Sequence, residues 1–367
     1  MQLTSILSPA AAILSTCGLA AGPASAAPDV PDVLERPAIE SARSSTRALL
    51  AVARAGKRLV SVGERGIILL SDDNGTTWHQ AKVPVSVSLT NVRFATDAKG
   101  WVVGHSGVVL HSADGGETWA RQLSGAQAAA MVLDAVRAKA SRQGVEAVRK
   151  ELAEAERLVA DGPDKPFLDV YFSDENHGLV VGAYGLAFAT EDGGEHWQPW
   201  SDRFPNPQGK HLYSIHASGN GLFVAGEQGA LFRSTDGGNS FANVNTPYSG
   251  TYFGALGGAT GELLVFGLRG NAYRSCDAGD SWQKVESGSH ASLTSGVRLS
   301  DGTVLLVDQA GEVLQSRDRG TSFRRLSLLN ASQASGIVEA ADGALILSGM
   351  RGMARVTLPT HLADQKR

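Results

Sequence analysis

The stretch Phe167–Trp197, FLDVYFSDENHGLVVGAYGLAFATEDGGEHW, decides how this chain folds. It holds three short apolar runs, Leu168–Phe172, Gly178–Val181 and Leu186–Thr190, each closed by Gly, Asp or Asn. Alternating β-formers between turn residues favour consecutive antiparallel strands. Residues 89–119, LTNVRFATDAKGWVVGHSGVVLHSADGGETW, show the same pattern with other side chains. The stretch is therefore one unit of a repeat.

A short turn of the form Gly-x-x-Gly is the first landmark of this repeat. The complete copies are Gly63–Gly66, Gly104–Gly107, Gly182–Gly185, Gly226–Gly229, Gly267–Gly270 and Gly349–Gly352. A degenerate copy, Asp308–Gly311, brings the total to seven. Successive copies begin 41, 78, 44, 41, 41 and 41 residues apart. A period near forty, with four strands per unit, is typical of a β-propeller, so the sequence predicts an all-β fold of seven blades.

The second landmark is Ser/Thr-x-Asp-x-Gly-x-Ser/Thr-Trp/Phe, known as the Asp-box or BNR repeat. It occurs at Ser71–Trp78, Ser112–Trp119, Thr190–Trp197, Ser234–Phe241, Ser275–Trp282 and Ser316–Phe323. An Asp side chain can accept hydrogen bonds from nearby backbone N–H groups, and the Gly supplies a positive φ. The motif is thus a folding device. The residues expected to be structural are Asp73, Asp114, Asp192, Asp236, Asp277 and Asp318, with Trp78, Trp119, Trp197 and Trp282.

The composition agrees with an all-β chain that has many turns. The 367 residues include 43 glycines, and charged residues make up only 19 %, below the roughly 25 % usual for soluble domains. The net charge of −4 and the isoelectric point near 6.1 give no overall signal for nucleic acid or an anionic membrane. We expect a monomer without a nucleic-acid partner.

Residues 1–26 are predicted to be a secretory signal peptide. Leu3–Ala21 is apolar or small, and Ala24–Ala26 has the small-x-small form of a cleavage site. Cleavage there gives an exported protein with an extended leader at residues 27–35, and a lipid anchor stays open as an alternative. Only Cys276 then remains, so no disulfide can form within the chain. No later stretch reaches the 18 or so continuous apolar residues that a membrane helix needs.

The propeller is predicted to span residues 36–358, with a polar tail at 359–367. Blade seven stops after three strands and has no Asp-box. Its predicted strands are Ser335–Val338, Ala344–Ser348 and Met353–Leu358. A closed ring removes exposed sheet edges. We therefore expect residues around Pro37–Ser41 to supply the missing outer strand of blade seven.

Residues 122–165 interrupt the repeat between blades two and three. This insertion is rich in Ala, Glu and Arg and nearly free of Gly. Val145, Val148, Leu152, Ala155 and Val159 follow one another at helical steps, which predicts one apolar helix face. Met131–Val136 suggests an earlier helix, with a break at Ser141–Gly144. Two interpretations stay open: an αα-hairpin packed on its own propeller, or a lid or partner-docking arm.

The Gly-x-x-Gly turns and the insertion are expected on one face, and the Asp-boxes on the other. Propellers usually bind at the first face, around the central channel. Arg occupies the second inner position of three turns, at Arg65, Arg269 and Arg351. Arginine suits carboxylate recognition and stacking on planar groups. The candidate partner-binding residues are Arg65, Arg269, Arg351, Tyr184, His105 and Gln228. The alternative is three solvated turn arginines, partnered by Glu64 or Glu227.

Catalytic and cofactor motifs are missing from the sequence. The nine histidines show no metal-ligand spacing such as His-Glu-x-x-His, and no Gly-x-Ser-x-Gly elbow is present. The Gly-x-x-Gly turns connect strands rather than a strand and a helix, so they do not form a phosphate loop. We expect no catalytic residue, metal or cofactor.

The units VYFSDENHGLVVGAYGLAFATEDGGEHW and VRFATDAKGWVVGHSGVVLHSADGGETW resemble the photosystem II assembly and stability factor family of Asp-box propellers and its bacterial relatives. The resemblance covers the mature chain outside the insertion. It implies an exported propeller that acts as an assembly factor and binds a membrane protein through an Arg-rich face. The insertion departs from the photosynthetic pattern and favours a non-photosynthetic relative, many of which are encoded near membrane transporters.

Two function classes follow. The first is a non-enzymatic scaffold that binds a membrane protein or complex, such as a transporter, through the Arg face and the insertion. The second is a sialidase-like glycosidase, which needs three Arg, a Tyr–Glu nucleophile pair and an Asp acid. Three Arg and Tyr184 are present, but the Arg-Ile-Pro expected before the first blade is replaced by Arg36-Pro37, a weak echo. Hydrolysis of a fluorogenic sialoside would distinguish the two.

Overall fold

Seven antiparallel sheets make up most of the computed structural model, which describes residues 32–326 and 333–358. The predicted signal peptide, the start of the leader and the C-terminal tail lie outside these described residues. Each sheet is an up-and-down meander in which strands consecutive in sequence are hydrogen-bonded neighbours. Short β-rich segments separated by Gly- and Asp-containing turns account for this topology.

The first four sheets, here called blades one to four, have four strands each. Blade one holds β1 (Leu49–Ala55), β2 (Arg58–Gly63), β3 (Ile68–Ser71) and β4 (His79–Gln80). Blade two holds β5 (Leu89–Phe94), β6 (Gly100–Gly104), β7 (Val109–Ser112) and β8 (Ala120–Leu123). Blade three holds β9 (Phe167–Phe172), β10 (Gly178–Gly182), β11 (Ala187–Thr190) and β12 (Gln198–Pro199). Blade four holds β13 (Leu212–Ser218), β14 (Gly221–Gly226), β15 (Leu231–Ser234) and β16 (Ala242–Asn243).

Blades five and six also have four strands, and the described part of blade seven has three. Blade five holds β17 (Tyr252–Gly257), β18 (Leu263–Gly267), β19 (Ala272–Ser275) and β20 (Gln283–Val285). Blade six holds β21 (Leu293–Arg298), β22 (Val304–Asp308), β23 (Val313–Ser316) and β24 (Arg324–Leu326). Blade seven holds β25 (Ala334–Glu339), β26 (Leu345–Gly349) and β27 (Gly352–Val356).

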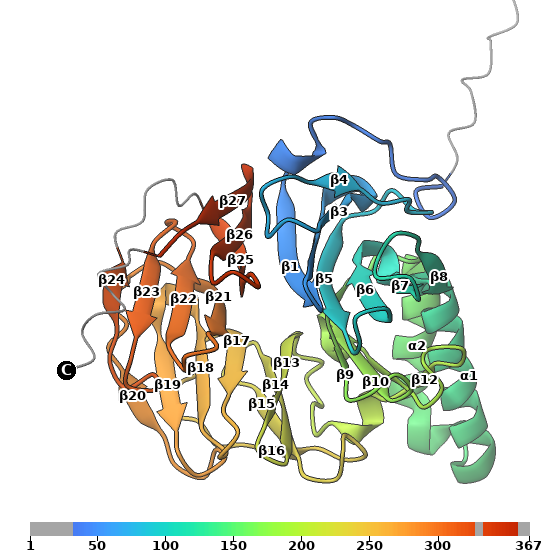
Figure 1. Cartoon of the computed structure of the whole chain (residues 1–367). Coiled ribbons are helices and arrows are strands. Elements are labelled where there is room, and N and C mark those ends of the chain that lie inside the picture. The colour runs from blue at the N-terminus through green and yellow to red at the C-terminus, as the bar shows by residue number, and fades with distance from the viewer. Residues whose placement is uncertain (1–31, 327–332, 359–367) are drawn as a thin grey trace, which may run out of the picture. The chain divides into compact units, whose positions relative to one another are not determined.

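The first strand of each sheet is the inner one, and the seven inner strands form a closed series. Each contacts the inner strand of the next blade, and β25 of blade seven returns to β1 of blade one. The fold is therefore a β-propeller with seven sheets around a central axis (Figure 1). The hydrophobic core lies between neighbouring sheets. Trp101 of β6, for example, is fully buried and stacks on Phe172 of β9, with 3.5 Å between the ring centroids.

The prediction that Pro37–Ser41 completes blade seven is wrong. Within the described residues blade seven stays three-stranded. The Ala38 N–H instead donates to the carbonyl of Val83 at 3.0 Å, and Gln80 Nε2 donates to the carbonyl of Ile39 at 3.1 Å. The segment thus lies along the outer edge of blade one. Its backbone groups find partners there because β4 has only two residues and leaves that edge largely unpaired.

Two helices, α1 (Gly125–Gln143) and α2 (Arg149–Asp161), lie between β8 and β9 and pack against each other beside β12 (Figure 1). Helix α1 begins earlier than Met131 because Ser124 and Gln127 form a capping box. The predicted break is present at Gly144, which caps α1. Of the predicted apolar face, Val148 and Ala155 are buried, whereas its two end residues, Val145 and Val159, are exposed.

Each Asp-box closes its own turn by hydrogen bonds to its carboxylate. In the first box Asp73 accepts from the Thr77 hydroxyl at 2.6 Å and from the Thr77 N–H at 2.8 Å. These bonds hold the pKa of Asp73 at about 2. In the third box the His196 ring replaces the hydroxyl, and its Nδ1 donates to Asp192 at 2.7 Å.

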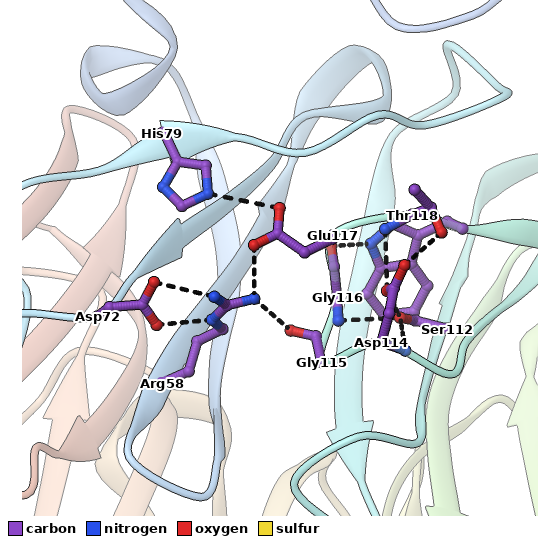
Figure 2. Close-up of polar contacts among 10 residues, drawn as sticks. Arg58, Asp72, His79, Ser112, Asp114, Gly115, Gly116, Glu117 and Thr118 are labelled. Atoms are coloured by element: carbon purple, nitrogen blue, oxygen red, sulfur yellow. Dashed lines mark hydrogen bonds and ion pairs between the residues drawn. The ribbon is translucent and has the colours of Figure 1, made fainter.

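The Asp-boxes also join neighbouring blades, because the preceding blade donates a hydrogen bond to a backbone carbonyl of each box. Figure 2 shows Arg58 of blade one donating to the carbonyl of Gly115 at 3.3 Å, while it pairs with Asp72 and Glu117. The equivalent bonds are Gln122 to Gly193, Trp200 to Gly238, Arg233 to Ala278, Arg274 to Arg319, and Arg355 to Asn74. The last bond joins blade seven to blade one and so helps to close the ring.

Candidate functional site

The Gly-x-x-Gly turns connect the second and third strands of each blade, at the end of the sheet opposite the Asp-boxes. The second residue inside five turns adopts the left-handed conformation, with φ between 52 and 57°. These residues are Arg65, Ser106, Tyr184, Gln228 and Arg269. Because the backbone repeats, their side chains leave the propeller from equivalent positions. We call this end of the molecule the turn face.

Arg65 and Arg269 share this backbone position, but Arg351 does not. Arg351 lies in a two-residue hairpin between the paired Gly349 and Gly352 and has an ordinary negative φ. The three arginines belong to blades one, five and seven, so blade six lies between Arg269 and Arg351. All three are exposed, and none forms an ion pair with a carboxylate of the described residues. Pairing with Glu64 or Glu227 is therefore not seen, whereas the other part of that sequence alternative, three solvated arginines, agrees with their exposure.

The other predicted turn residues differ in their contacts. His105 is exposed, and its backbone N–H donates to the carbonyl of Ser88 at 2.8 Å. Gln228 is exposed, and its backbone carbonyl accepts from Lys210 Nζ at 3.2 Å. Tyr184 is 61 % exposed, and its ring lies between Lys165 Nζ, 5.1 Å from the centroid, and the His211 ring. No described Glu contacts its hydroxyl, so the Tyr–Glu pair of a sialidase is not assembled there.

A row of rings on the turn face was not expected from the sequence. Tyr184 lies 4.9 Å from His211, His211 lies 6.2 Å from Tyr213, and Tyr213 lies 5.4 Å from Phe253, measured between ring centroids. The row crosses from blade three to blade five, and we call it the aromatic row. Tyr213 and Phe253 follow the first residue of their inner strands, β13 and β17, at corresponding places. That correspondence was the sequence signal that could have identified them.

The inner strands also bring charged groups together near the axis. Asp169 of β9 is only 2 % exposed and accepts hydrogen bonds from Asn91 Nδ2, at 2.6 Å, and from the N–H of Ile215, at 2.6 Å. Burial raises its pKa to about 6, against the opposing charge of Arg93. These bonds link the inner strands of blades two, three and four. Asp169 is therefore a structural anchor of the ring.

His216 of β13 carries the opposite pKa shift. Burial, together with the positive charges of Arg93 and Arg298, lowers its pKa to about 3. An unfolded histidine titrates near pH 6.5, so the unfolded chain binds the proton first as the pH falls. The stabilising contribution of a neutral His216 is present above pH 6.5 and is lost progressively towards pH 3.

We predict that His216→Gln reduces the loss of stability on acidification. Thermal unfolding of the variant and of the parent protein between pH 7.5 and pH 4.5 measures this. The difference in melting temperature should shift in favour of the variant as the pH falls, because glutamine has no proton to bind. His290→Gln is a matched control, since His290 is exposed and forms no ion pair with a carboxylate of the described residues. Parallel curves for parent and His216→Gln would contradict the prediction.

The described residues offer little for other site classes. No group of three or more His, Cys, Asp or Glu side chains in residues 32–326 and 333–358 is placed to hold a metal ion. In the same part of the chain, no helix combines the length and apolar character needed to cross a bilayer. The turn face, with its exposed arginines and aromatic row, is the candidate site.

Comparison with known proteins places the chain in a family. The family described as "Photosynthesis system II assembly factor YCF48" matches residues 40–141 and 153–333. A photosystem II assembly lipoprotein Ycf48 from Synechococcus sp. (strain CC9902) is 37 % identical over 100 residues, which are 26 % of this chain and 30 % of that protein. The aligned stretch thus spans less than a third of this relative.

Two solved structures of the same name share the fold. YCF48 from Cyanidioschyzon merolae is 17 % identical, with a TM-score of 0.61, covering 86 % of this chain and 97 % of its own. A structure described as YCF48 bound to D1 peptide is 16 % identical, with a TM-score of 0.60, covering 88 % and 96 %. At such identities the structures show the propeller fold alone, whereas the family match spans most of the sequence. The chain is a member of the photosystem II assembly factor YCF48 family.

Proposed function

We propose that the protein is an exported, non-enzymatic assembly factor that binds a membrane protein or membrane complex through its turn face. The family match over residues 40–141 and 153–333 is the observation that carries this proposal. A relative described as bound to D1 peptide supports a protein ligand. Relatives described as lipoproteins support an exported location at a membrane.

Three arginines are the proposed contacts for acidic groups of the partner. Arg65, Arg269 and Arg351 are exposed and have no carboxylate partner among the described residues. Their guanidinium groups can therefore pair with a carboxylate from outside without first breaking an internal ion pair. Such charge-assisted, bidentate bonds are among the stronger polar contacts that proteins make. Tyr184, His105 and Gln228 would complete the contact surface.

The helical insertion is proposed as a second contact region on the same side. Its connection to β8 and β9 places its ends near the turn of blade two, since α1 contacts the turn His105–Gly107. Val145, in the connection between the two helices, and Val159, near the end of α2, remain exposed. A partner that extends from the turn face along the insertion could cover both. The insertion departs from the photosynthetic pattern, which favours a transporter over photosystem II as the partner. Affinity purification of the protein from membranes distinguishes these two partners.

We predict that charge reversal of the arginines releases the partner without unfolding the protein. The triple variant Arg65→Glu, Arg269→Glu, Arg351→Glu should lose about tenfold or more of the membrane protein that co-purifies from detergent-solubilised membranes, since each lost charge pair costs roughly 1 kcal/mol or more. Its melting temperature should stay near that of the parent, because the replaced side chains form no internal ion pair. The measurement is quantitative mass spectrometry of the affinity eluate.

A matched control carries the same change of charge at the other end of the sheets. Arg54, Lys57 and Arg317 are exposed there, and their triple replacement by Glu should keep the partner. Equal loss in both triple variants would show a general effect of net charge. Retention of the partner by the turn-face variant would contradict the proposed role of the arginines.

A further inference from the structure

One position of the inner strands divides the seven blades into two classes. In each blade the residue after the first residue of the inner strand is an unpaired bulge in the register. Blades two, six and seven have a hydroxyl residue there, and blades one, three, four and five have a large apolar or aromatic residue. The residues in blade order are Leu50, Thr90, Leu168, Tyr213, Phe253, Thr294 and Ser335.

The hydroxyl residues show what the fold requires at this position. Thr90 Oγ1 donates to the carbonyl of Phe167 at 2.7 Å, and Thr294 Oγ1 donates to the carbonyl of Ala334 at 2.9 Å. Ser335 Oγ donates to the carbonyl of Leu49 at 2.7 Å. In each case the acceptor is the first residue of the next inner strand. A small hydroxyl side chain therefore joins adjacent blades here.

The large residues forgo this bond and gain no full burial in exchange. Tyr213 and Phe253 are only partly buried, and neither is packed into the described hydrophobic clusters between the blades. Apolar area left in water stabilises nothing, whereas covering it is favourable by roughly 25 cal/mol per Å². The stability of the fold therefore does not explain why Tyr213 and Phe253 are large at this position. A ligand that covers their exposed apolar area would explain it.

Charge complements this apolar surface at its blade-five end. The backbone N–H of Leu268 donates to the carbonyl of Thr251 at 2.9 Å, which holds the turn that carries Arg269 over the start of the strand that carries Phe253. The carboxylate of Glu227, in the turn of blade four, accepts a hydrogen bond from the backbone N–H of His211 at 2.9 Å. The turn that carries Arg269, whose guanidinium has no carboxylate partner among the described residues, thus lies beside the start of the strand that carries Phe253.

We propose that this corner of the turn face binds an extended peptide in which an aromatic side chain stands close to an acidic group. The aromatic side chain covers Tyr213 and Phe253, and the carboxylate pairs with Arg269. Edge-to-face ring contacts, like the one already present between Tyr213 and Phe253, favour an aromatic over an aliphatic side chain. The inference rests on the proposed function and specifies which segments of a partner would be recognised.

A peptide fits the corner better than a lipid surface does. Tyr213 and Phe253 are partly buried, whereas the polar residues Gln228 and Arg269 on the neighbouring turns are exposed. A flat bilayer would meet the exposed turns first. A single protruding side chain can reach past the turns and cover the two rings. Membrane-inserting rings usually project from the surface instead.

The test uses the full mature protein and fluorescent ten-residue peptides measured by fluorescence anisotropy. Each peptide ends in Asp-Glu and carries Phe at one of four upstream positions, with a matched peptide carrying Ser. The protein variant is Tyr213→Thr, Phe253→Thr, which installs the residue that blades two and six already use. We expect the best Phe peptide to bind the parent about tenfold or more tightly than its Ser counterpart, and the variant to lose this preference.

Threonine at these positions is expected to keep the fold, and the melting temperature of the variant checks this. Leu50→Thr makes the same kind of change on blade one, away from the aromatic row, and should keep the Phe preference. Equal binding of Phe and Ser peptides by the parent, or a Phe preference that survives the double replacement, would overturn the inference. Binding to phosphatidylglycerol vesicles is measured for the same proteins. If the Tyr213→Thr, Phe253→Thr variant loses vesicle binding but keeps peptide binding, the inference is also overturned.

These outcomes are separable from failure of the proposed function. If the Arg269→Glu variant loses both peptides equally while the parent prefers Phe, both ideas stand. If the parent binds no peptide but still co-purifies with a membrane protein that the triple Arg variant releases, only the aromatic inference fails. If co-purification is insensitive to the arginines while Phe discrimination persists, the role proposed for the arginines fails instead.

Discussion

Replacing Gly267 with alanine is expected to destabilise the propeller by about 3 kcal/mol or more, at or above the upper end for overpacking substitutions. Gly267 is the first glycine of the turn in blade five, and its φ of 177° is extended backbone that any residue adopts. The difficulty is space, because a Cβ there would lie 2.1 Å from the carbonyl oxygen of Thr251 and 2.8 Å from the Cα of Tyr252. Both obstacles are backbone atoms of the adjacent inner strand, so the clash cannot be relieved by a change of rotamer.

The same close approach explains why the first glycine recurs. A Cβ on Gly182 would lie 2.3 Å from the carbonyl of Pro166, and one on Gly349 would lie 2.0 Å from that of Gln333. In these blades the turn lies directly on the chain that enters the inner strand. Gly182→Ala should therefore behave like Gly267→Ala.

A second glycine separates crowding from backbone strain. Gly237 has a φ of 74°, but a Cβ there would meet no atom within 4 Å. Gly237→Ala should cost only about 1 kcal/mol, the price of a left-handed alanine. Thermal and urea unfolding of the variants measure both effects. If Gly267→Ala unfolds at the same point as Gly237→Ala, the crowding account is wrong.

Asp169→Ala is expected to cost about 4 kcal/mol of unfolding free energy. The carboxylate accepts from Asn91 Nδ2 at 2.6 Å, from the N–H of Val170 at 2.7 Å and from the N–H of Ile215 at 2.6 Å. The substitution leaves two buried backbone donors and one partly buried side-chain donor without their acceptor, and an unsatisfied buried donor costs roughly 1 to 3 kcal/mol. Because the donors come from three successive blades, the loss loosens the ring on both sides of β9.

The cost should depend on pH in a defined direction. Burial raises the pKa of folded Asp169 to about 6, above that of an aspartate in an unfolded chain. The folded protein therefore binds a proton first, and the contribution of Asp169 to stability grows as the pH falls from above 6 to below about 3.9. The difference in melting temperature between parent and Asp169→Ala should be larger at pH 5 than at pH 7.5.

Asp97→Ala serves as the control, since Asp97 is an exposed loop carboxylate. It should change the melting temperature by less than about one degree at either pH, as surface substitutions usually do. A parent–variant difference for Asp169 that stays constant between pH 7.5 and pH 5 would contradict the raised pKa. A difference no larger than that of Asp97→Ala would contradict the role of Asp169 as an anchor.

The repeat made most of the fold predictable. Strand and turn recur in all seven units and the Asp-box in six of them, and each depends on residues within about ten positions of one another. The bonds of Asp73 to Thr76 and Thr77, for example, span three or four residues. Local patterns of this kind are readable because the groups that satisfy them are close in sequence.

The candidate site was only partly predictable for the opposite reason. The positions of Arg65, Tyr184 and Gln228 followed from the turns that carry them. The equivalence of Arg351 failed, because its turn is a two-residue hairpin with a different backbone. The aromatic row was missed because its rings come from three different blades, and only the closed ring of blades brings these side chains together.

The sequence by itself determined the number of sheets, the strand order within each and the chemistry of the Asp-box turns. Only the tertiary structure decided which side chains join neighbouring blades and where Pro37–Ser41 lies. It also decided which charged groups of the inner strands come together near the axis. The physical reason is distance along the chain. The bonds that close the ring, such as Ser335 to Leu49 and Arg355 to Asn74, join residues 286 and 281 positions apart. No local pattern specifies such pairs, and they form only when seven sheets have closed around one axis.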